Sequence, residues 1–204
     1  YECEEKVPEA ITPTPETTIG LKYSLSHFYV ADSGEMADPP RWLKQSRERL
    51  EELQSRISRM EPGSRNYQEA VQKYRLLHEH IANQRRDFIH KESSRIANGW
   101  NAVCVRDDNL REMARAIKLG RVPDAGFGRF RECLRYKLER QGKPLILVER
   151  YEPTTRTCSA CGFVGDAVPT KEKTWVCPKC GAVHNREVNA ARNIKLEGLA
   201  QLCA

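Results

Sequence analysis

Four cysteines in the last quarter of the chain are the residues whose type and spacing most clearly predict chemistry. They form two Cys-x-x-Cys pairs with fifteen residues between them: Cys158, Cys161, Cys177 and Cys180. Each pair turns tightly enough to aim two thiolates at one point, so two pairs supply the four ligands of a tetrahedral zinc ion. Gly162 and Gly181 follow the pairs and give each turn backbone freedom. Because four protein ligands leave no open coordination position, the spacing predicts a structural zinc ribbon.

The other cysteines are scattered, and they argue against a secreted disulfide scaffold. Cys104 lies in the apolar run 102–105, where a buried thiol is expected. This usage predicts a reducing, intracellular compartment, and we expect a cytoplasmic protein. The sequence has no run of about 18 apolar residues, so we expect no membrane span. It does not open with an apolar leader, so we expect no secretory signal.

The charge balance moderately favours an anionic partner. The 204 residues include 34 Lys and Arg against 28 Asp and Glu, a net charge of +6. Five basic residues are candidate nucleic-acid contacts, four near the end of a long predicted helix and one farther along the chain: Arg85, Arg86, Lys91, Arg95 and Arg111. Two interpretations stay open for the helical group, namely contact with phosphates and solvated charge favoured by the helix dipole.

Strands alternate with helices along the chain. The predicted strands lie at 17–22, 26–31, 102–105 and 145–148, and the predicted helices at 41–60, 66–96, 127–141 and 187–199. Pro62 and Gly63 separate the first two helices, which predicts an antiparallel helical hairpin. The four apolar residues 145–148 stand between breakers and predict a strand buried on both faces. This order indicates an α/β layer fold.

Several ordered motifs then resemble one family. Residues 149–162, 177–181 and 184–194 resemble the C-terminal signature of TnpB proteins, which are transposon-encoded relatives of the type V CRISPR effectors. Residues 80–90 resemble the long-helix motif of that family, and residues 124–130 resemble the start of the helix before its last core strand. The resemblance implies an α/β, RNase H-like (RuvC) fold with an inserted helical hairpin and a four-cysteine zinc ribbon.

The resemblance also implies a domain organisation. We expect a linker from an N-terminal lobe at 1–16, a RuvC-like domain at 17–152 with the hairpin at 41–98, the zinc ribbon at 153–184, and a C-terminal helix and tail at 185–204. The chain begins with Tyr1 instead of Met. The lobes with which the family grips its guide would precede Tyr1, so we expect the chain to be part of a longer protein.

Proteins of this family work as ribonucleoproteins, in which a guide RNA pairs with double-stranded DNA and the RuvC-type domain cuts it. Cutting needs carboxylates that hold two divalent ions. Here Thr18 is aligned with the aspartate of a G-x-D-x-G strand, Arg106 with a strand glutamate, and Asn185 and Glu187 with the aspartates of an H-D-R-D-x-N-A-A run. The substitutions predict an inactivated nuclease, which is not an enzyme and binds no catalytic magnesium. We expect instead a monomeric, RNA-guided repressor that occupies matching DNA and is then associated with the nucleoid.

Two alternatives stay open. The chain could be an active RNA-guided endonuclease with a rearranged acidic site, in which Asp107 or Asp108 takes over a metal-binding role. It could instead be a decayed transposon remnant or a zinc-ribbon scaffold for other proteins. Cleavage by the reconstituted complex with magnesium would identify the first alternative, and a lack of co-purifying RNA would identify the second. For Arg106, contact with phosphates and drift after loss of selection are both open interpretations.

Overall fold

The computed structural model describes residues 8–24, 26–38, 42–109, 126–166 and 172–203. The chain divides into two compact units, one made of residues 1–38 and 92–204 and the other of residues 39–91. Each unit is described by itself below. Arg111, one of the five predicted nucleic-acid contacts, lies outside the described residues. Among the described helices, none is long and apolar enough to cross a membrane.

A five-stranded sheet forms the centre of the larger unit. Its strands are β1 (Thr18–Tyr23), β2 (Tyr29–Ala31), β3 (Met36–Ala37), β4 (Ala102–Arg106) and β5 (Leu145–Val148). The order is β3-β2-β1-β4-β5; β4 runs parallel to β1 and β5, and β2 runs antiparallel to β1 and β3. The predicted α/β class is therefore confirmed. The two-residue strand β3 was not predicted, because it is too short to show periodicity.

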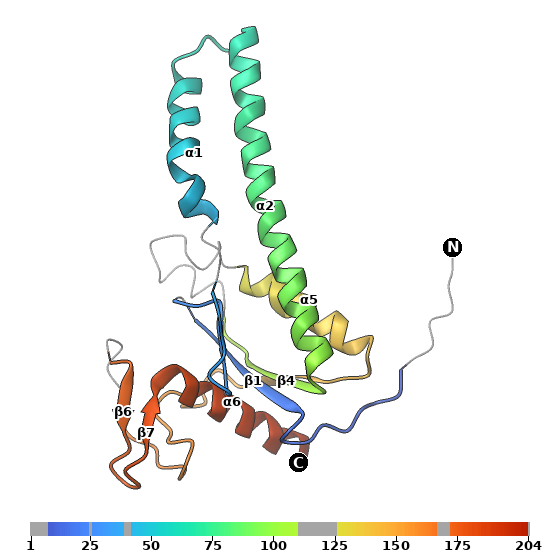
Figure 1. Cartoon of the computed structure of the whole chain (residues 1–204), viewed down its shortest axis with the longest axis vertical. Coiled ribbons are helices and arrows are strands. Elements are labelled where there is room, and N and C mark those ends of the chain that lie inside the picture. Colours follow the sequence, from blue (N-terminus) through green and yellow to red (C-terminus); the bar gives the residue numbers. More distant parts are fainter. Residues whose placement is uncertain (1–7, 25, 39–41, 110–125, 167–171, 204) are drawn as a thin grey trace. The chain divides into compact units, whose positions relative to one another are not determined.

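Helix α5 (Phe127–Glu139) covers one face of this sheet through aromatic packing (Figure 1). Its Phe127 stacks on Tyr23 of β1 with ring centroids 4.9 Å apart. Its Phe130 meets Phe28 edge to face at 4.9 Å, and Phe127, Phe130 and Phe28 are all buried. Aromatic pairs in these geometries add stability beyond the area that they bury.

Helix α6 (Arg186–Cys203) covers the other face and approaches the strands closely. A Cβ atom on Gly20 would overlap the carbonyl oxygen of Ala191, so β1 needs a glycine where the helix crosses it. A Cβ on Gly198 would likewise overlap Cys104, whose buried thiol has its pKa raised to about 12 by desolvation. Because side chains alternate along a strand, Lys22 faces the same side as Gly20, the side of α6.

Strand β5 differs from its prediction. It was expected to be buried on both faces, but Ile146 and Val148 are buried while Leu145 and Leu147 are only half-buried. The buried side packs with Ile194 of α6. The opposite side is covered less completely, because β5 is the last strand of the sheet.

The smaller unit contains the helical hairpin, as predicted. Helix α1 (Trp42–Ser58) and helix α2 (Arg65–Gly99) are joined through Gly63, which has a φ of 89°. Leu50 and Ile81 are the buried centre of an apolar cluster that also contains Tyr74, Leu77 and Phe88. The boundary between the two units falls within α2, after Lys91.

A second, two-stranded sheet lies in the cysteine-rich region. Strands β6 (Thr174–Val176) and β7 (Val183–Asn185) pair antiparallel, with Trp175 opposite His184. Neither strand was predicted, since three residues are too few for a periodic pattern. Strand β7 leads directly into α6, so this small sheet is joined without a linker to the helix that covers the main sheet.

Candidate functional site

The four predicted zinc ligands come together in space. Their sulfur atoms all lie within 4.8 Å of one another, and the Cys158–Cys180 and Cys161–Cys177 sulfurs are each 3.7 Å apart. The edge of a tetrahedron with metal–sulfur bonds of about 2.3 Å measures about 3.8 Å. A disulfide would require about 2.05 Å, and these thiols are free. The arrangement therefore fits one tetrahedral metal ion such as zinc.

Each cysteine pair is closed by a backbone hydrogen bond at its glycine. The N–H of Gly162 donates to the carbonyl of Cys158, and the N–H of Gly181 donates to the carbonyl of Cys177, both at 2.9 Å. The two glycines have φ angles of 71° and 73°, a left-handed conformation that glycine adopts at little cost. Local backbone geometry thus aims both sulfurs of each pair at the same point.

The electrostatics of the cluster favour a bound cation. Burial raises the pKa of Cys177, but N–H groups from Cys180 and Lys179 outweigh it and bring this pKa down to about 7. At Cys180 the Ala182 N–H lowers the pKa, but Cys161 and burial raise it more, to about 12. Four adjacent thiols cannot all ionise unaided, and a divalent metal supplies the charge that lets them.

His184 is a buried neighbour of this cluster to which the sequence had given no role. Its Nε2 lies 3.1 Å from the Cys158 sulfur, and its ring lies 4.9 Å from the ring of Trp175. Burial and the nearby charge of Arg192 lower its pKa, which favours the neutral imidazole. An N–H at Nε2 would donate to the sulfur and orient it, as partners outside the ligand shell do in metal sites. The sequence contained one signal that could have drawn attention to His184, namely its place at the start of the run that resembles H-D-R-D.

A second cluster, the charged strand-end cluster, lies at the carboxyl ends of β1 and β4. It consists of Lys22, Ser24, Arg106, Asp108 and Glu187. The Lys22 ammonium is 3.4 Å from the Glu187 carboxylate, and the Ser24 hydroxyl donates to the same carboxylate at 3.1 Å. The Arg106 guanidinium is 2.8 Å from Asp108.

This cluster is partly shielded from water. The side chains of Lys22 and Asp108 are only 18% and 11% exposed. Burial lowers the pKa of Lys22, the Glu187 carboxylate counteracts this, and the positive charges of Arg186 and Arg106 lower it further. Three cations therefore lie within electrostatic reach of one another at the strand ends.

Thr18, which was aligned with the first metal-binding aspartate, lies away from the charged strand-end cluster. Thr18 lies opposite Ala102 at the amino end of the strands, and its buried hydroxyl donates to the carbonyl of Thr14. Lys22 is four residues farther along β1, which is about 13 Å at about 3.3 Å per residue. The residue that reaches Glu187 is therefore Lys22. Taking Gly20 as the first glycine of G-x-D-x-G, a signal in the sequence itself, places Lys22 at the aspartate.

The other aligned positions lie near one end of the sheet. Arg106 and Glu187 both belong to the charged strand-end cluster. Asn185 has a structural role, because its side-chain oxygen accepts hydrogen bonds from the N–H groups of Glu187 and Val188 at 3.0 and 3.2 Å. Such a cap satisfies donors at the start of a helix.

The charged strand-end cluster contains cations as well as carboxylates. Cleavage with two metals needs several carboxylates that converge on the ions. Here Lys22 and Arg106 bring positive charge, and both carboxylates are already ion-paired. Two unit charges 4 Å apart interact by about 4 kcal/mol at an effective dielectric of about 20, and a divalent ion doubles the repulsion.

Two of the predicted nucleic-acid contacts on α2, Lys91 and Arg95, have carboxylate neighbours. Lys91 is 2.8 Å from Asp87, and Arg95 contacts Glu35 at 2.9 Å and Glu92 at 3.1 Å. Arg86 is exposed and Arg85 is half-buried. That Arg85, Arg86, Lys91, Arg95 and Arg111 contact nucleic acid stays a prediction.

Two family models match successive parts of the chain. One, described as "Probable transposase" (OrfB_IS605), matches residues 1–116. The other, described as "Cas12f1-like, TNB domain", matches residues 127–194. Together they cover both the sheet with its hairpin and the cysteine-rich region.

Curated relatives and solved structures agree with these matches. A Streptomyces pristinaespiralis protein named "Putative RNA-guided DNA endonuclease" is 35% identical over 94% of this chain and 48% of its own length. The Escherichia coli protein of that name, InsQ, is 27% identical over 98% of this chain and 54% of its own. The chain thus spans about half the length of these relatives.

The fold matches a Cas12f1 chain from a complex with sgRNA and target DNA. The TM-score is 0.62 at 19% identity, over 93% of this chain and 40% of the other. This likeness supports the RuvC-containing α/β fold that was predicted. The names of the relatives describe enzymes, and they contradict the prediction that this chain is not an enzyme.

Proposed function

Because the chain belongs to the OrfB/IS605 family of transposases, we propose that it is the RuvC-type half of a protein that binds DNA under the direction of a guide RNA. The observation that carries this proposal is the 35% identity, over 94% of the chain, to a relative named as an RNA-guided DNA endonuclease. The Cas12f1 chain with the same fold was solved with sgRNA and target DNA, which supports the same two partners here.

The relatives are about twice as long as this chain, so the activity is proposed for a protein of their length. In such a complex, base pairing between guide and target supplies the sequence specificity, and the protein supplies contacts to the nucleic-acid backbone. We propose that occupation of guide-matched promoter DNA blocks transcription. The metal of the four-cysteine site is proposed to be a structural zinc ion, because all four ligands come from the protein.

We propose a specific role for the charged strand-end cluster: Lys22 and Arg106 neutralise phosphates of the bound DNA. Replacing Lys22 by Met or Arg106 by Gln should weaken binding to matched and unmatched DNA about equally, because phosphate contacts carry no sequence information. Each change should also reduce the slope of log affinity against log salt by about 1. The measurement is a DNA titration with the full-length complex at several salt concentrations.

Arg47 offers a matched control for this titration. It is an exposed arginine on α1 whose guanidinium is 2.7 Å from Glu51. Arg47→Gln removes one surface cation and should leave affinity and salt slope unchanged. An unchanged salt slope in both the Lys22 and Arg106 variants would refute their proposed contact with phosphates.

Cleavage of the guided DNA is a second candidate activity, favoured by the names of the relatives. Three of the described carboxylates near the strand ends, Asp107, Asp108 and Glu187, are ion-paired, with Arg131, Arg106 and Lys22 respectively. Cleavage through them therefore requires that nucleic acid binding opens these pairs. Guide-dependent scission of a plasmid by the full-length complex would assign this activity.

RNA that co-purifies with the full-length protein tests the proposal at its first step. An RNA-guided protein should retain a defined RNA species through purification in moderate salt, because many phosphate contacts hold it. Sequencing should return one scaffold with a variable guide segment. A random sample of cellular RNA, or none, would contradict the proposed function.

A further inference from the structure

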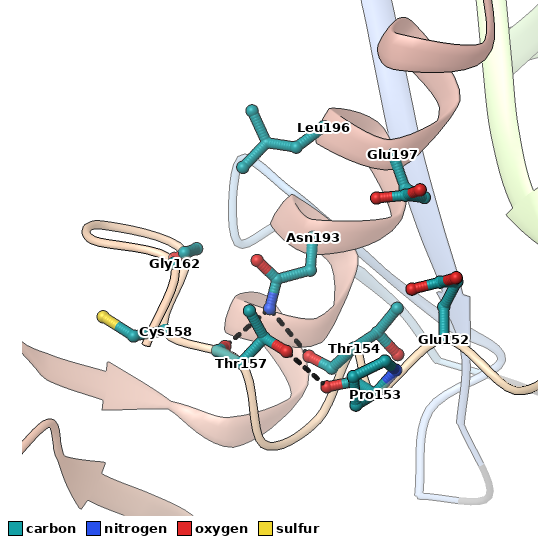
Figure 2. A pocket seen from close by; sticks show the side chains of 10 residues that line it. Glu152, Pro153, Thr154, Thr157, Cys158, Gly162, Asn193, Leu196 and Glu197 are labelled. Carbon is teal, nitrogen blue, oxygen red and sulfur yellow. Dashed lines mark hydrogen bonds between the residues drawn. The ribbon is translucent and has the colours of Figure 1, made fainter. Parts of the chain in front are cut away.

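Two buried asparagines on α6 hold the first cysteine pair of the ribbon. The Asn189 side chain accepts a hydrogen bond from the N–H of Ser159 at 3.0 Å and donates to the carbonyl of Thr157 at 2.7 Å. The Asn193 side chain donates to the carbonyls of Thr157 and Thr154 at 2.7 and 2.8 Å, as Figure 2 shows. Asn189 and Asn193 are only 1% and 7% exposed. They lie one turn apart on the helix and therefore face the same side.

Polar contacts hold this junction. A pocket of about 200 Å³ lies beside the Asn193 amide, between the segment that carries Thr154 and Thr157 and helix α6. Leu196, the apolar helix residue that lines it, remains 53% exposed. Buried hydrogen bonds whose partners would otherwise be unsatisfied are costly to remove.

The second cysteine pair is attached to the same helix by a different route. Strand β7 follows Cys180 and continues into α6, and the N–H of Arg186 donates to the carbonyl of Lys173 at 2.8 Å. A metal ion that joins the two pairs therefore closes a ring. Its three parts are the asparagine contacts, the metal and the connection from β7 into α6.

The start of α6 also carries a member of the charged strand-end cluster. Glu187 lies in the first turn of α6, two residues before Asn189, and contacts Lys22 and Ser24 of the sheet. The later turns of α6 have their own support, because Ala191 packs on Gly20 and Gly198 packs on Cys104. Opening the ring should therefore loosen the first turn and leave the later turns in place.

We propose that Asn189 and Asn193 are positioning residues that couple metal binding in the ribbon to the placement of Glu187 beside Lys22. The cysteine pairs and the strand ends thereby behave as one unit when the metal is bound. This inference rests on contacts within the chain and does not depend on which nucleic acid the protein binds.

Hydrogen exchange of the full-length protein, with and without zinc, tests the coupling. Removing zinc with a chelator should speed amide exchange at residues 187–190 as well as in the ribbon. Exchange at residues 194–198 should stay slow, because the sheet supports that part of the helix. Unchanged exchange at 187–190 in a protein whose ribbon has lost its metal and its protection would overturn the proposal.

Variants test the two residues directly. Asn189→Ala and Asn193→Ala should each weaken zinc binding, measured by competition with a chromophoric chelator, by about 10-fold, the lower end of the range for partners outside the ligand shell. Asn189→Asp keeps the acceptor for Ser159 but places a buried carboxylate oxygen against the Thr157 carbonyl, so its effect should be at least as large as that of Asn189→Ala. In both Ala variants exchange at 187–190 should already be fast with zinc bound.

Gln201→Ala is the matched control, since it removes an exposed amide from the same helix. It should alter neither the zinc affinity nor the exchange at 187–190. Wild-type zinc affinity in both Ala variants would overturn the proposal. If a variant does not fold, the zinc-dependent exchange of the unmodified protein still decides between the outcomes.

Discussion

Replacing Cys158 with Ser is expected to remove the bound metal and to unfold the cysteine-rich region. The four sulfurs are mutually within 4.8 Å, so loss of one leaves three ligands and an open position. Binding of zinc to such sites supplies about 10–16 kcal/mol, far more than two three-residue strands can supply by pairing. We expect zinc affinity to fall by more than about 100-fold. Zinc content after dialysis and amide exchange across residues 153–185 measure the two effects.

The matched control is Cys133→Ala, which removes a buried thiol from α5, outside the ribbon. That variant should retain its zinc and normal exchange in the ribbon, although it loses some stability from the cavity. A Cys158→Ser protein that keeps stoichiometric zinc, or that keeps a protected ribbon without metal, would contradict the structural role of the ion.

Motifs whose geometry is set within a few residues could be predicted from the sequence. The Cys-x-x-Cys pairs were such a case, because each pair and its glycine form one local turn. Gly162 and Gly181 use the predicted backbone freedom to adopt a left-handed conformation. The hairpin was another, since Pro62 and Gly63 separate its two helices in the sequence. Leu50 and Ile81 form its buried centre. In both cases the deciding interactions lie within one element or between adjacent elements.

The charged strand-end cluster could not be predicted in the same way. Thr18 was aligned with the aspartate of the motif, whereas Lys22 contacts Glu187 across 165 positions of sequence. The reason that β1 contains Gly20 is the close approach of α6. The sequence offers two registers for the motif, one with the aspartate position at Thr18 and one that starts at Gly20, and the local pattern of the strand does not decide between them. The tertiary contact between β1 and α6 favours the second.

The asparagine contacts of α6 were also beyond sequence reasoning. Asn189 and Asn193 belonged to a motif that was matched to a family without a role for either residue. Their partners are backbone atoms of Thr154, Thr157 and Ser159, which any residue type could supply. These hydrogen bonds become visible only in the folded structure.

The largest expected effect of all follows from the proposed RNA-guided binding of DNA by the full-length protein. Guide-matched DNA should bind at least about 1,000-fold more tightly than scrambled DNA at physiological salt, since specific complexes exceed non-specific ones by such factors. The basic surface alone, with a chain charge of +6, would bind both alike. Mismatches at the end of the target where pairing with the guide begins should abolish binding, whereas mismatches at its far end should be tolerated.

The most direct measurement is therefore one pair of titrations with the purified ribonucleoprotein. Guide-matched and scrambled DNA duplexes with the same flanking sequence are titrated into the ribonucleoprotein before and after treatment with ribonuclease. RNA-guided binding predicts tight binding of the matched duplex alone and its loss after the treatment. Equal affinities for the two duplexes, or tight binding that survives digestion of the RNA, would contradict RNA-guided DNA binding as the function of this protein.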